Sequence, residues 1–194
     1  LIRGYTEKDE LGGDDPYSAS KAAADIAAQS YLGNFAKYPW AIARAGNVVG
    51  GGDWSTNRLL PDIVRAKIKN VPIELRHPSA VRPWQHVMDV SLAYLSCIET
   101  LLEEMKVASI NIGPSEHSLE VRKLIELAQN FWPDKVLTVE SLHNKKIESE
   151  NLRLDSTLAS NLLRWRNRCS QIEAINLTFR WWDAHIFKVE MVSA

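Results

Sequence analysis

The segment Tyr17-Ser18-Ala19-Ser20-Lys21 decides how the rest of this chain is interpreted. Tyr17 and Lys21 are four residues apart, so on a helix they lie on the same face, one turn from each other. An ammonium group beside a phenol favours the phenolate, and a tyrosine with that neighbour can exchange protons near neutral pH. The pair is therefore a candidate general acid/base. An amphipathic helix that carries one Tyr and one Lys by chance remains the alternative on these five residues alone.

The flanking residues predict a helix from residue 16 to about residue 36. Asp15 is suited to cap its N-terminus and Pro16 to occupy its first turn. Gly33 and Asn34 predict its end. The helix has small side chains that allow a neighbouring helix or a cofactor to approach closely: Ala19, Ala22, Ala23, Ala24, Ala27 and Ala28.

A glycine-rich segment follows the predicted buried parallel strand Trp40–Ala45, and it reads Gly46-Asn47-Val48-Val49-Gly50-Gly51-Gly52-Asp53-Trp54. In open parallel sheets, ligands bind beyond the carboxyl ends of the strands. Consecutive glycines let the backbone approach a ligand and offer amide donors to phosphate oxygens. The segment is therefore a candidate binding loop, with a flexible turn as the alternative.

A second candidate binding segment reads Arg82-Pro83-Trp84-Gln85-His86-Val87. A guanidinium group can grip phosphate oxygens in two places, which makes Arg82 a candidate ligand of a diphosphate. Arg58, at the start of a predicted helix over residues 58–68, is a candidate for the same diphosphate, with an exposed surface role as the alternative. We expect His86 to be a structural, hydrogen-bonded histidine.

These segments, from Tyr17-Ser18-Ala19-Ser20-Lys21 to Arg82-Pro83-Trp84, resemble the extended short-chain dehydrogenase/reductase family. The resemblance is strong from about Tyr5 to Pro114 and traceable to about Trp182. Within the family, Asp53-Trp54 turns the likeness towards the 4,6-dehydratases of CDP-glucose. The family's α/β fold implies that residues 1–70 are the C-terminal part of a Rossmann-type parallel sheet with the active-site helix. Residues 71–194 are implied to be mostly a small α/β substrate lobe, interleaved with the first part.

The resemblance implies NAD as the cofactor and a nucleotide-sugar, CDP-glucose above all, as the substrate. It implies that Tyr17 takes the proton from the 4-hydroxyl while hydride leaves C4, after which water is lost across C5 and C6. Lys21 would assist Tyr17, and both would hold the nicotinamide ribose. Three residues are implied to position the nucleotide diphosphate: Asn47, Arg82 and Asn111. For Asn111, a turn-capping role is the alternative.

Three other interpretations remain open at this stage. A nucleotide-sugar 4-epimerase or another 4,6-dehydratase would share Tyr17 and Lys21. A truncated, non-catalytic remnant that binds only a nucleotide or a partner chain belongs to a different class. The chain begins at Leu1 without the family's glycine fingerprint G-x-x-G-x-x-G, so we expect a C-terminal part whose N-terminal half, with the acid/base pair for the elimination, lies outside this sequence. Family members commonly pair through the Tyr-Lys helix, which implies a homodimer.

The charge, the hydropathy and the cysteines of the chain argue against several kinds of partner and site. The net charge of −1 and the pI near 6.6 give no support for a nucleic-acid partner. No apolar run approaches the roughly 20 residues of a membrane span. Cys97 and Cys169 lack metal-ligand or C-x-x-C spacing, so we expect no metal site and a reduced, cytoplasmic protein.

The remaining segments follow helical and strand patterns. Asp89 is expected to cap the helix that follows it. Arg164 stands where the family usually has Gly, at a position suited to positive φ. Ile147 stands where the nearest relatives tend to have His. Trp181 and Trp182 are predicted to be core residues. The predicted helices are 90–104, 119–131 and 172–187, and the predicted strands are 71–75, 109–113 and 136–139.

Overall fold

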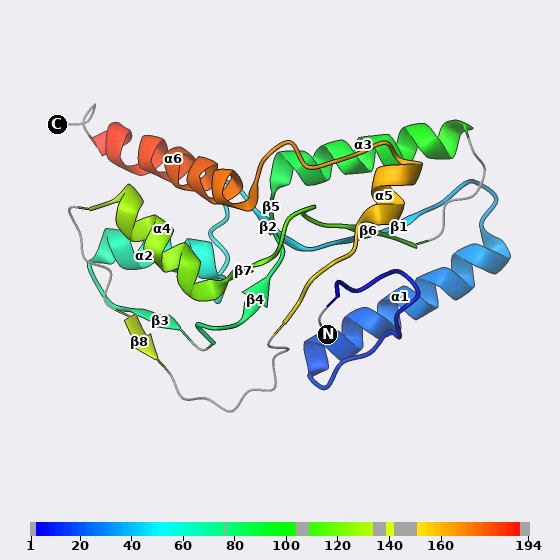
Figure 1. Cartoon of the computed structure of the whole chain (residues 1–194), viewed down its shortest axis with the longest axis horizontal. Helices are drawn as coiled ribbons and strands as arrows, with labels where there is room; N and C mark the ends of the chain where they lie inside the picture. Colours follow the sequence, from blue (N-terminus) through cyan, green and yellow to red (C-terminus); the bar gives the residue numbers. More distant parts are fainter. Residues whose placement is uncertain (1–2, 76, 104–108, 134–138, 142–150, 191–194) are drawn as a thin grey trace.

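The computed structural model describes residues 3–75, 77–103, 109–133, 139–141 and 151–190 (Figure 1). The helices in these ranges are α1 (Pro16–Phe35), α2 (Leu59–Lys69), α3 (Val87–Glu103), α4 (Val121–Phe131), α5 (Thr157–Leu162) and α6 (Gln171–Glu190). The strands are β1 (Ile42–Ala45), β2 (Asn47–Val49), β3 (Ile73–Leu75), β4 (Val81–Arg82), β5 (Trp84–His86), β6 (Ser109–Ile112), β7 (Leu119–Glu120) and β8 (Val139–Ser141).

The strands pair mainly in parallel, as the sequence predicts for a Rossmann-type sheet. The parallel pairs are β1 with β6, β2 with β5, and β3 with β8, whereas β4 and β7 pair antiparallel. Parallel neighbours need long crossover connections, and α2 and α3 lie within those connections here. The pairs β1–β6 and β2–β5 each join a strand before residue 70 to one after it. Strand pairing therefore crosses residue 70, and the division into two interleaved parts at that residue stays a prediction.

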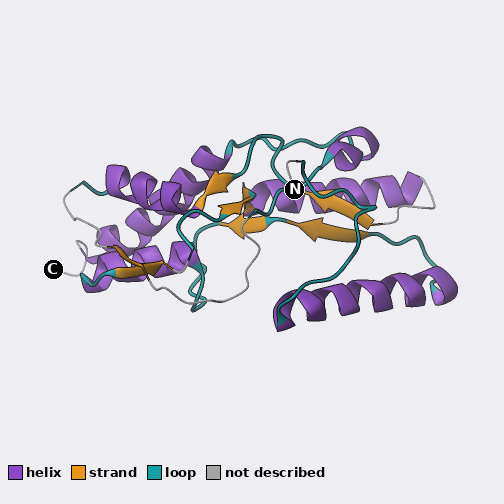
Figure 2. Ribbon diagram, turned by 60° about the horizontal axis from the view of Figure 1, so that its bottom comes forward, coloured by secondary structure: helices purple, strands orange, loops and turns teal. Residues whose placement is uncertain are grey.

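Two apolar clusters hold these elements together. The larger one lies between α2, α4 and α6 and the strands β2, β3 and β5. The smaller one lies between α3, β6 and α5, with Ala93 and Cys97 of α3 facing Ile110 and Ile112 of β6. Figures 1 and 2 show α1 on one side of the β1–β6 pair and α3 on the other. The β1–β6 pair is therefore covered by a helix on each face.

Most of the predicted elements are confirmed, with two corrections. The segment Asn47–Val49 was expected within a loop, but it forms β2 because it pairs with Trp84–His86 of β5. The strand before it was expected to be buried, whereas all four residues of β1 are half-buried. The strand predicted over residues 136–139 lies largely outside the described residues, and Ile147 lies outside them altogether.

Candidate active site

The N-terminus of α1 is fixed by Asp15, as the sequence predicts. Its carboxylate accepts hydrogen bonds from the backbone N–H of Tyr17 at 2.9 Å and of Ser18 at 3.0 Å, and Pro16 occupies the first turn. Hydrogen bonds from the Ser18 hydroxyl and backbone hold the pKa of Asp15 below its usual value. The first turn of the helix, which carries Tyr17, is therefore well defined.

Tyr17 and Lys21 lie one turn apart on α1, and both are exposed. The Tyr17 side chain is 72 % exposed, and no residue of α1 is buried. The face that carries the pair is thus open to a ligand. This is the arrangement that the sequence predicts for a tyrosine acid/base assisted by a lysine.

Helix α1 is attached to the sheet through a two-pronged ion pair. Arg44 of β1 donates from Nε to Asp25 of α1 at 2.8 Å and from Nη2 at 2.9 Å. Arg44 also donates to the hydroxyl of Ser109 on β6 at 3.2 Å. The hydrogen bond from Arg44 holds the pKa of Asp25 below its usual value. The half-buried guanidinium of Arg44 therefore joins α1 to β1 and β6.

Asn47 opens β2 and lies beside the second candidate segment. Its backbone N–H donates to the carbonyl of Pro83 at 2.9 Å, and Asn47 is opposite Trp84 in the β2–β5 register. A Cβ atom on the preceding Gly46 would lie 2.8 Å from the Pro83 carbonyl oxygen, so only glycine permits this approach. The structure thus brings Asn47 next to the segment that begins at Arg82.

The glycines after β2 have a use that the sequence did not reveal. A Cβ atom on Gly51 would lie 2.1 Å from Cδ2 of Trp181, and the same indole lies next to Gly52, whose φ is +83°. Gly51 therefore accommodates an indole from α6. Trp182 is fully buried as predicted, whereas Trp181 is 42 % exposed and packs on this loop.

Arg58 is the N-cap residue of α2 and is exposed. Burial raises the pKa of Asp53, but the hydrogen bonds from Ser55 outweigh it. The positive charges of Arg58 and Arg65 act in the same direction as Ser55, so the pKa of Asp53 lies below its usual value. The loop that leads to Arg58 thus carries an ionised Asp53.

Arg82 lies on β4, and a neighbouring arginine enters the same region from a distant part of the chain. The backbone N–H of Leu152 donates to the carbonyl of Val81 at 3.0 Å, and Asn151 forms a bridge with Val81, so residues 151 and 152 run beside β4. The Nε atom of Arg153 is buried without a hydrogen-bond partner. The sequence analysis did not single out Arg153, because the backbone pairing of the residues before it with Val81 joins segments about 70 residues apart.

Asn111 is buried in β6, with an exposed fraction of 2 %. Its side-chain amide donates to the carbonyl of Tyr5 at 2.9 Å, and its backbone N–H donates to the carboxylate of Glu7 at 2.8 Å. Asn111 therefore anchors the N-terminal loop. Its predicted contact with a nucleotide remains a prediction.

Three further expectations meet the structure with different results. His86 accepts a hydrogen bond at Nδ1 from the backbone N–H of Met88, in line with a structural role. The prediction that Asp89 caps a helix is wrong, because α3 begins at Val87 and the buried Asp89 carboxylate accepts from the backbone N–H groups of Arg168 and Cys169. Arg164 has a φ of +50°, so the expectation of a glycine-type backbone is confirmed.

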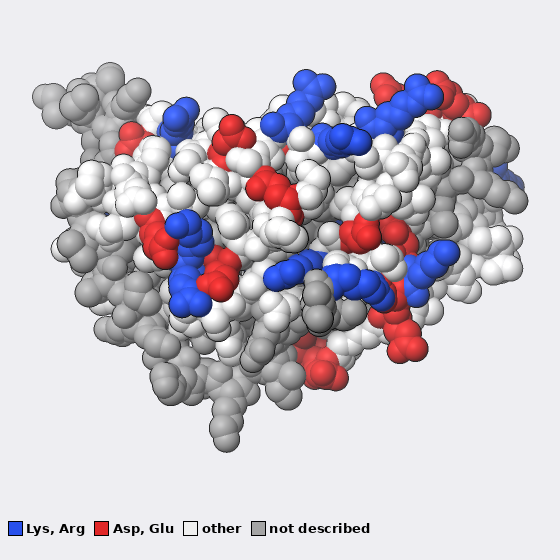
Figure 3. Space-filling view, in the orientation of Figure 1, with Lys and Arg blue, Asp and Glu red and all other residues white. Residues whose placement is uncertain are grey.

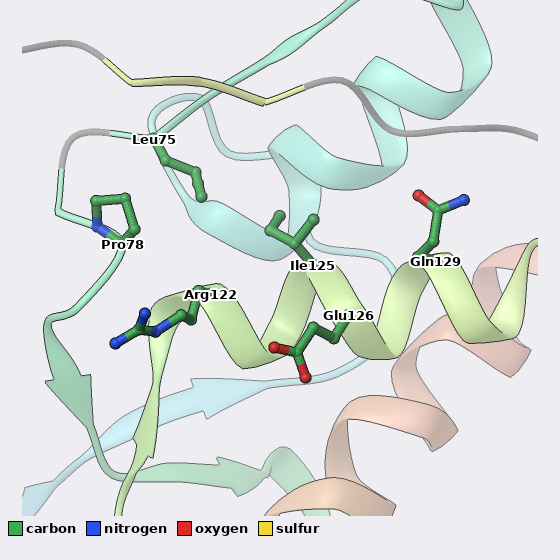
Figure 4. Close-up of a pocket in the computed structure, with 6 residues that line it drawn as sticks. All are labelled: Leu75, Pro78, Arg122, Ile125, Glu126 and Gln129. Carbon is green, nitrogen blue, oxygen red and sulfur yellow. The ribbon is translucent and has the colours of Figure 1, made fainter.

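A pocket among the described residues lies away from these site residues (Figure 4). It has a volume of about 300 Å³ and lies between β3 and α4. Three apolar and three polar side chains line it: Leu75, Pro78, Ile125, Arg122, Glu126 and Gln129. None of the predicted site residues is among them, so this pocket gives no support to the predicted cofactor and substrate site.

Comparison with known proteins identifies the family. Residues 2–113 match the NAD dependent epimerase/dehydratase family. The chain belongs to that family. It is 34 % identical to the CDP-glucose 4,6-dehydratase of Salmonella typhimurium over 98 % of this chain, and spans 56 % of that relative's length. It is 24 % identical to a trifunctional UDP-glucose 4,6-dehydratase of Arabidopsis thaliana over 92 % of this chain, and spans 26 % of that protein.

Solved structures confirm the Rossmann-type α/β fold. The dTDP-glucose 4,6-dehydratase of Bacillus anthracis, solved with NAD, aligns with a TM-score of 0.80 at 22 % identity, covering 95 % of this chain and 57 % of that one. The UDP-glucuronic acid 4-epimerase of Bacillus cereus aligns with a TM-score of 0.83 at 17 % identity, covering 94 % of this chain and 57 % of that one. The chain thus spans little more than half the length of these family members.

The described residues contain neither a metal-site cluster nor a membrane-spanning helix. In those ranges no three or more His, Cys, Asp and Glu side chains gather as a metal site would require. None of the described helices is both long and apolar enough to cross a membrane. Lysine and arginine alternate with aspartate and glutamate over the face drawn in Figure 3.

Proposed function

We propose that the protein to which these residues belong converts CDP-glucose to CDP-4-keto-6-deoxyglucose in an NAD-dependent dehydration. The observation that carries the proposal is the 34 % identity with a CDP-glucose 4,6-dehydratase across 98 % of this chain. The chain spans 56 % of that relative, so the activity is proposed for the whole protein. The exposed Tyr17–Lys21 face supports it, and so do the segments of Asn47 and Arg82, which lie next to each other.

In this proposal Tyr17 and Lys21 hold the nicotinamide ribose and handle the first proton. Both side chains are on the open face of α1, so they fit such a ligand. NAD, when bound, supplies a hydride acceptor for C4 and a hydride donor for C6. The ammonium of Lys21 stabilises Tyr17 as the phenolate, and this phenolate takes the proton from the glucose 4-hydroxyl and becomes the phenol. The 4-keto group makes the C5 proton acidic, and water is then lost across C5 and C6.

The diphosphate is assigned to cationic and amide side chains. Arg82 grips phosphate oxygens with its guanidinium fork, Arg58 adds a second positive charge, and Asn47 and Asn111 complete the proposed set. Arg153, with its buried unpartnered Nε near β4, supports a binding role for this region. We further propose residues 1–70 as the cofactor part and residues 71–194 as mostly the substrate lobe.

We also propose a cytoplasmic homodimer. The two free cysteines, Cys97 and Cys169, support a reducing compartment. Helix α1 exposes Tyr31 and Phe35 at 64 % and 70 %, which supports pairing through that helix. The near-neutral charge favours neither nucleic acid nor a membrane as partner.

The proposed function is tested by incubating the protein with NAD and either CDP-glucose, dTDP-glucose or UDP-glucose. The expected product, detected by mass spectrometry, is lighter than CDP-glucose by one water. A product of unchanged mass with inverted C4 would mean a 4-epimerase, and binding without any product would mean a non-catalytic protein. Tyr17→Phe removes only a hydroxyl at an exposed position, so it should lower turnover by at least about 100-fold. The circular dichroism spectrum and the unfolding midpoint of this variant should stay unchanged.

A further inference from the structure

The loop between β2 and α2, residues 50–58, is held by three separate contacts. The first comes from α6, where Trp181 packs directly against Gly51. The indole lies so close that a Cβ atom on Gly51 would be 2.1 Å from Cδ2 and 2.2 Å from Cγ. Trp181 also stacks on His185 of the same helix, with ring centroids 4.7 Å apart and an interplanar angle of 19°. The ring is thus oriented from its own helix as well as by the loop.

The second and third contacts hold the middle of the loop. Trp54 meets Trp182 edge to face, with ring centroids 4.4 Å apart, and Trp182 is fully buried. Arg65 of α2 donates to the carbonyl of Trp54 at 2.9 Å and to that of Ser55 at 2.7 Å, while it pairs with Asp62. The loop is therefore fixed to α6 at two points and to α2 at one.

Arg58 lies at the end of this loop and takes its position from it. It is the N-cap residue of α2, with extended backbone and no capping hydrogen bond from its own side chain. A guanidinium has only donors, so it cannot cap the N–H groups of a helix start. Residues 50–57 lead directly into Arg58, and the path of this loop therefore contributes to the position of its backbone. Leu60 and Ile63 hold α2 itself in the larger apolar cluster, so a shift of the loop at Gly51 would act on Arg58 through residues 52–57 and not through the helix.

We infer that Trp181 is a positioning residue that, by packing on Gly51, sets the loop carrying Arg58 and so controls affinity for the substrate's diphosphate. This inference rests on the proposed function for the identity of the substrate. It also assigns a reason to Gly51, which is glycine in order to admit the indole. The sequence pattern alone suggests the opposite, that the glycine admits a phosphate.

The experiment compares wild type, Trp181→Ala, Trp181→Phe, Gly51→Ala and the double variant Gly51→Ala/Trp181→Ala. Calorimetry measures Kd for CDP-glucose and, separately, for NAD. We expect Trp181→Ala to raise the Kd for CDP-glucose about tenfold, because misplacing a binding group by about 1 Å can cost up to a hundredfold. The Kd for NAD should stay within about twofold, since the loop is remote in sequence from Tyr17 and Lys21, and Trp181→Phe should restore part of the affinity. A general loss of folding would weaken both ligands.

The double variant separates the two reasons for Gly51. If the glycine serves the indole, Gly51→Ala weakens CDP-glucose binding in the wild-type background but adds nothing to Trp181→Ala. An additional loss in the double variant would mean that the glycine faces the ligand, and the inference would be overturned. Unchanged affinity of Trp181→Ala for CDP-glucose would overturn it as well.

A matched control and a second measurement complete the test. Ile172→Ala removes a side chain of the same helix with similar exposure, 40 % against 42 %, and should leave the Kd for CDP-glucose unchanged. If wild type itself binds no CDP-glucose, the proposed function fails. Unfolding midpoints of the same variants then decide the packing claim: the effects of Gly51→Ala and Trp181→Ala must be non-additive if the two residues serve one contact.

Discussion

Helices α1 and α6 have the same length of 20 residues and opposite relations to the core. Helix α1 carries Tyr17 and Lys21 and buries none of its residues. Helix α6 carries no proposed catalytic residue and buries several side chains: Gln171, Ala174, Ile175, Thr178, Phe179 and Trp182. The difference shows that the proposed chemistry lies on a helix positioned by polar contacts, while apolar packing fixes the opposite part of the molecule.

The sequences of the two helices explain the contrast. In α6, large apolar residues recur at positions 175, 179 and 182, on one helical face, and Phe179 among them packs against Phe131 and Trp132 of the α4 region. In α1, the large apolar residues Ile26, Tyr31 and Phe35 are exposed instead, at 55 %, 64 % and 70 %. Its placement depends instead on Asp15 at its start and on the Asp25–Arg44 ion pair.

The largest expected effect on stability is at Phe179. Its side chain is fully buried and its ring centroid lies 4.9 Å from that of Trp132. Phe179→Ala should lower the free energy of unfolding by about 3–5 kcal/mol, as measured by urea denaturation. Leu177→Ala on the exposed side of the same helix is the control, with an expected loss below about 1 kcal/mol. Equal losses from the two variants would remove the basis for treating α6 as a core helix.

A smaller effect is expected at Asp25, which tests the polar attachment of α1. Asp25→Asn breaks a charge-assisted pair and should cost about 2 kcal/mol at pH 7. Because the pKa of Asp25 is lowered in the folded state, its contribution is complete above the unfolded pKa of about 3.9 and is lost as the pH falls through the folded value.

The difference between wild type and Asp25→Asn should therefore shrink when urea denaturation is repeated near pH 3. Asp14→Asn, at an exposed position just before α1, serves as the control and should change little at either pH. A difference between wild type and Asp25→Asn that did not depend on pH would show that the loss comes from something other than the ionised carboxylate.

The smallest effect concerns the turn that leads towards α6. Arg164 has a φ of +50°, a conformation that costs a non-glycine residue free energy, so Arg164→Gly should stabilise the protein by up to about 1 kcal/mol. Asn70, with a φ of +53°, is the matched site, and Asn70→Gly should gain less because asparagine tolerates this region. Thermal unfolding measures both. Destabilisation by Arg164→Gly would mean that its side chain makes contacts worth more than the backbone strain.

Local signals in the sequence predicted the features that depend on neighbouring residues. The Asp15 cap and the extent of α1 follow from short-range rules, and the structure has both. The positive φ at Arg164 was expected from the family resemblance, and the structure has it as well. The family resemblance supplied the parallel pairing. The positions of Asn47, Arg58, Arg82 and Asn111 in a common binding site remain predictions.

The features that the sequence did not reveal all depend on distant partners. Asn47–Val49 looks like loop because three residues carry no periodicity, yet they pair with a strand 37 residues further on. Asp89 resembles a helix cap, but its carboxylate receives backbone N–H groups about 80 residues away. Gly51 resembles a phosphate loop because nothing nearby shows that Trp181 lies over it.

The bridge between Tyr5 and Leu154 affects the order in which the protein assembles during synthesis. The backbone of Tyr5 bonds to Arg153 and Asp155, and its carbonyl also receives Asn111. At about 5–20 residues per second, a ribosome takes roughly 10–30 s to add the 150 residues between the two partners. Asp25 and Arg44 are both available long before that time. On a translating ribosome, α1 therefore acquires its anchor to β1 early, while the loop that precedes it waits until residues 153–155 have been made.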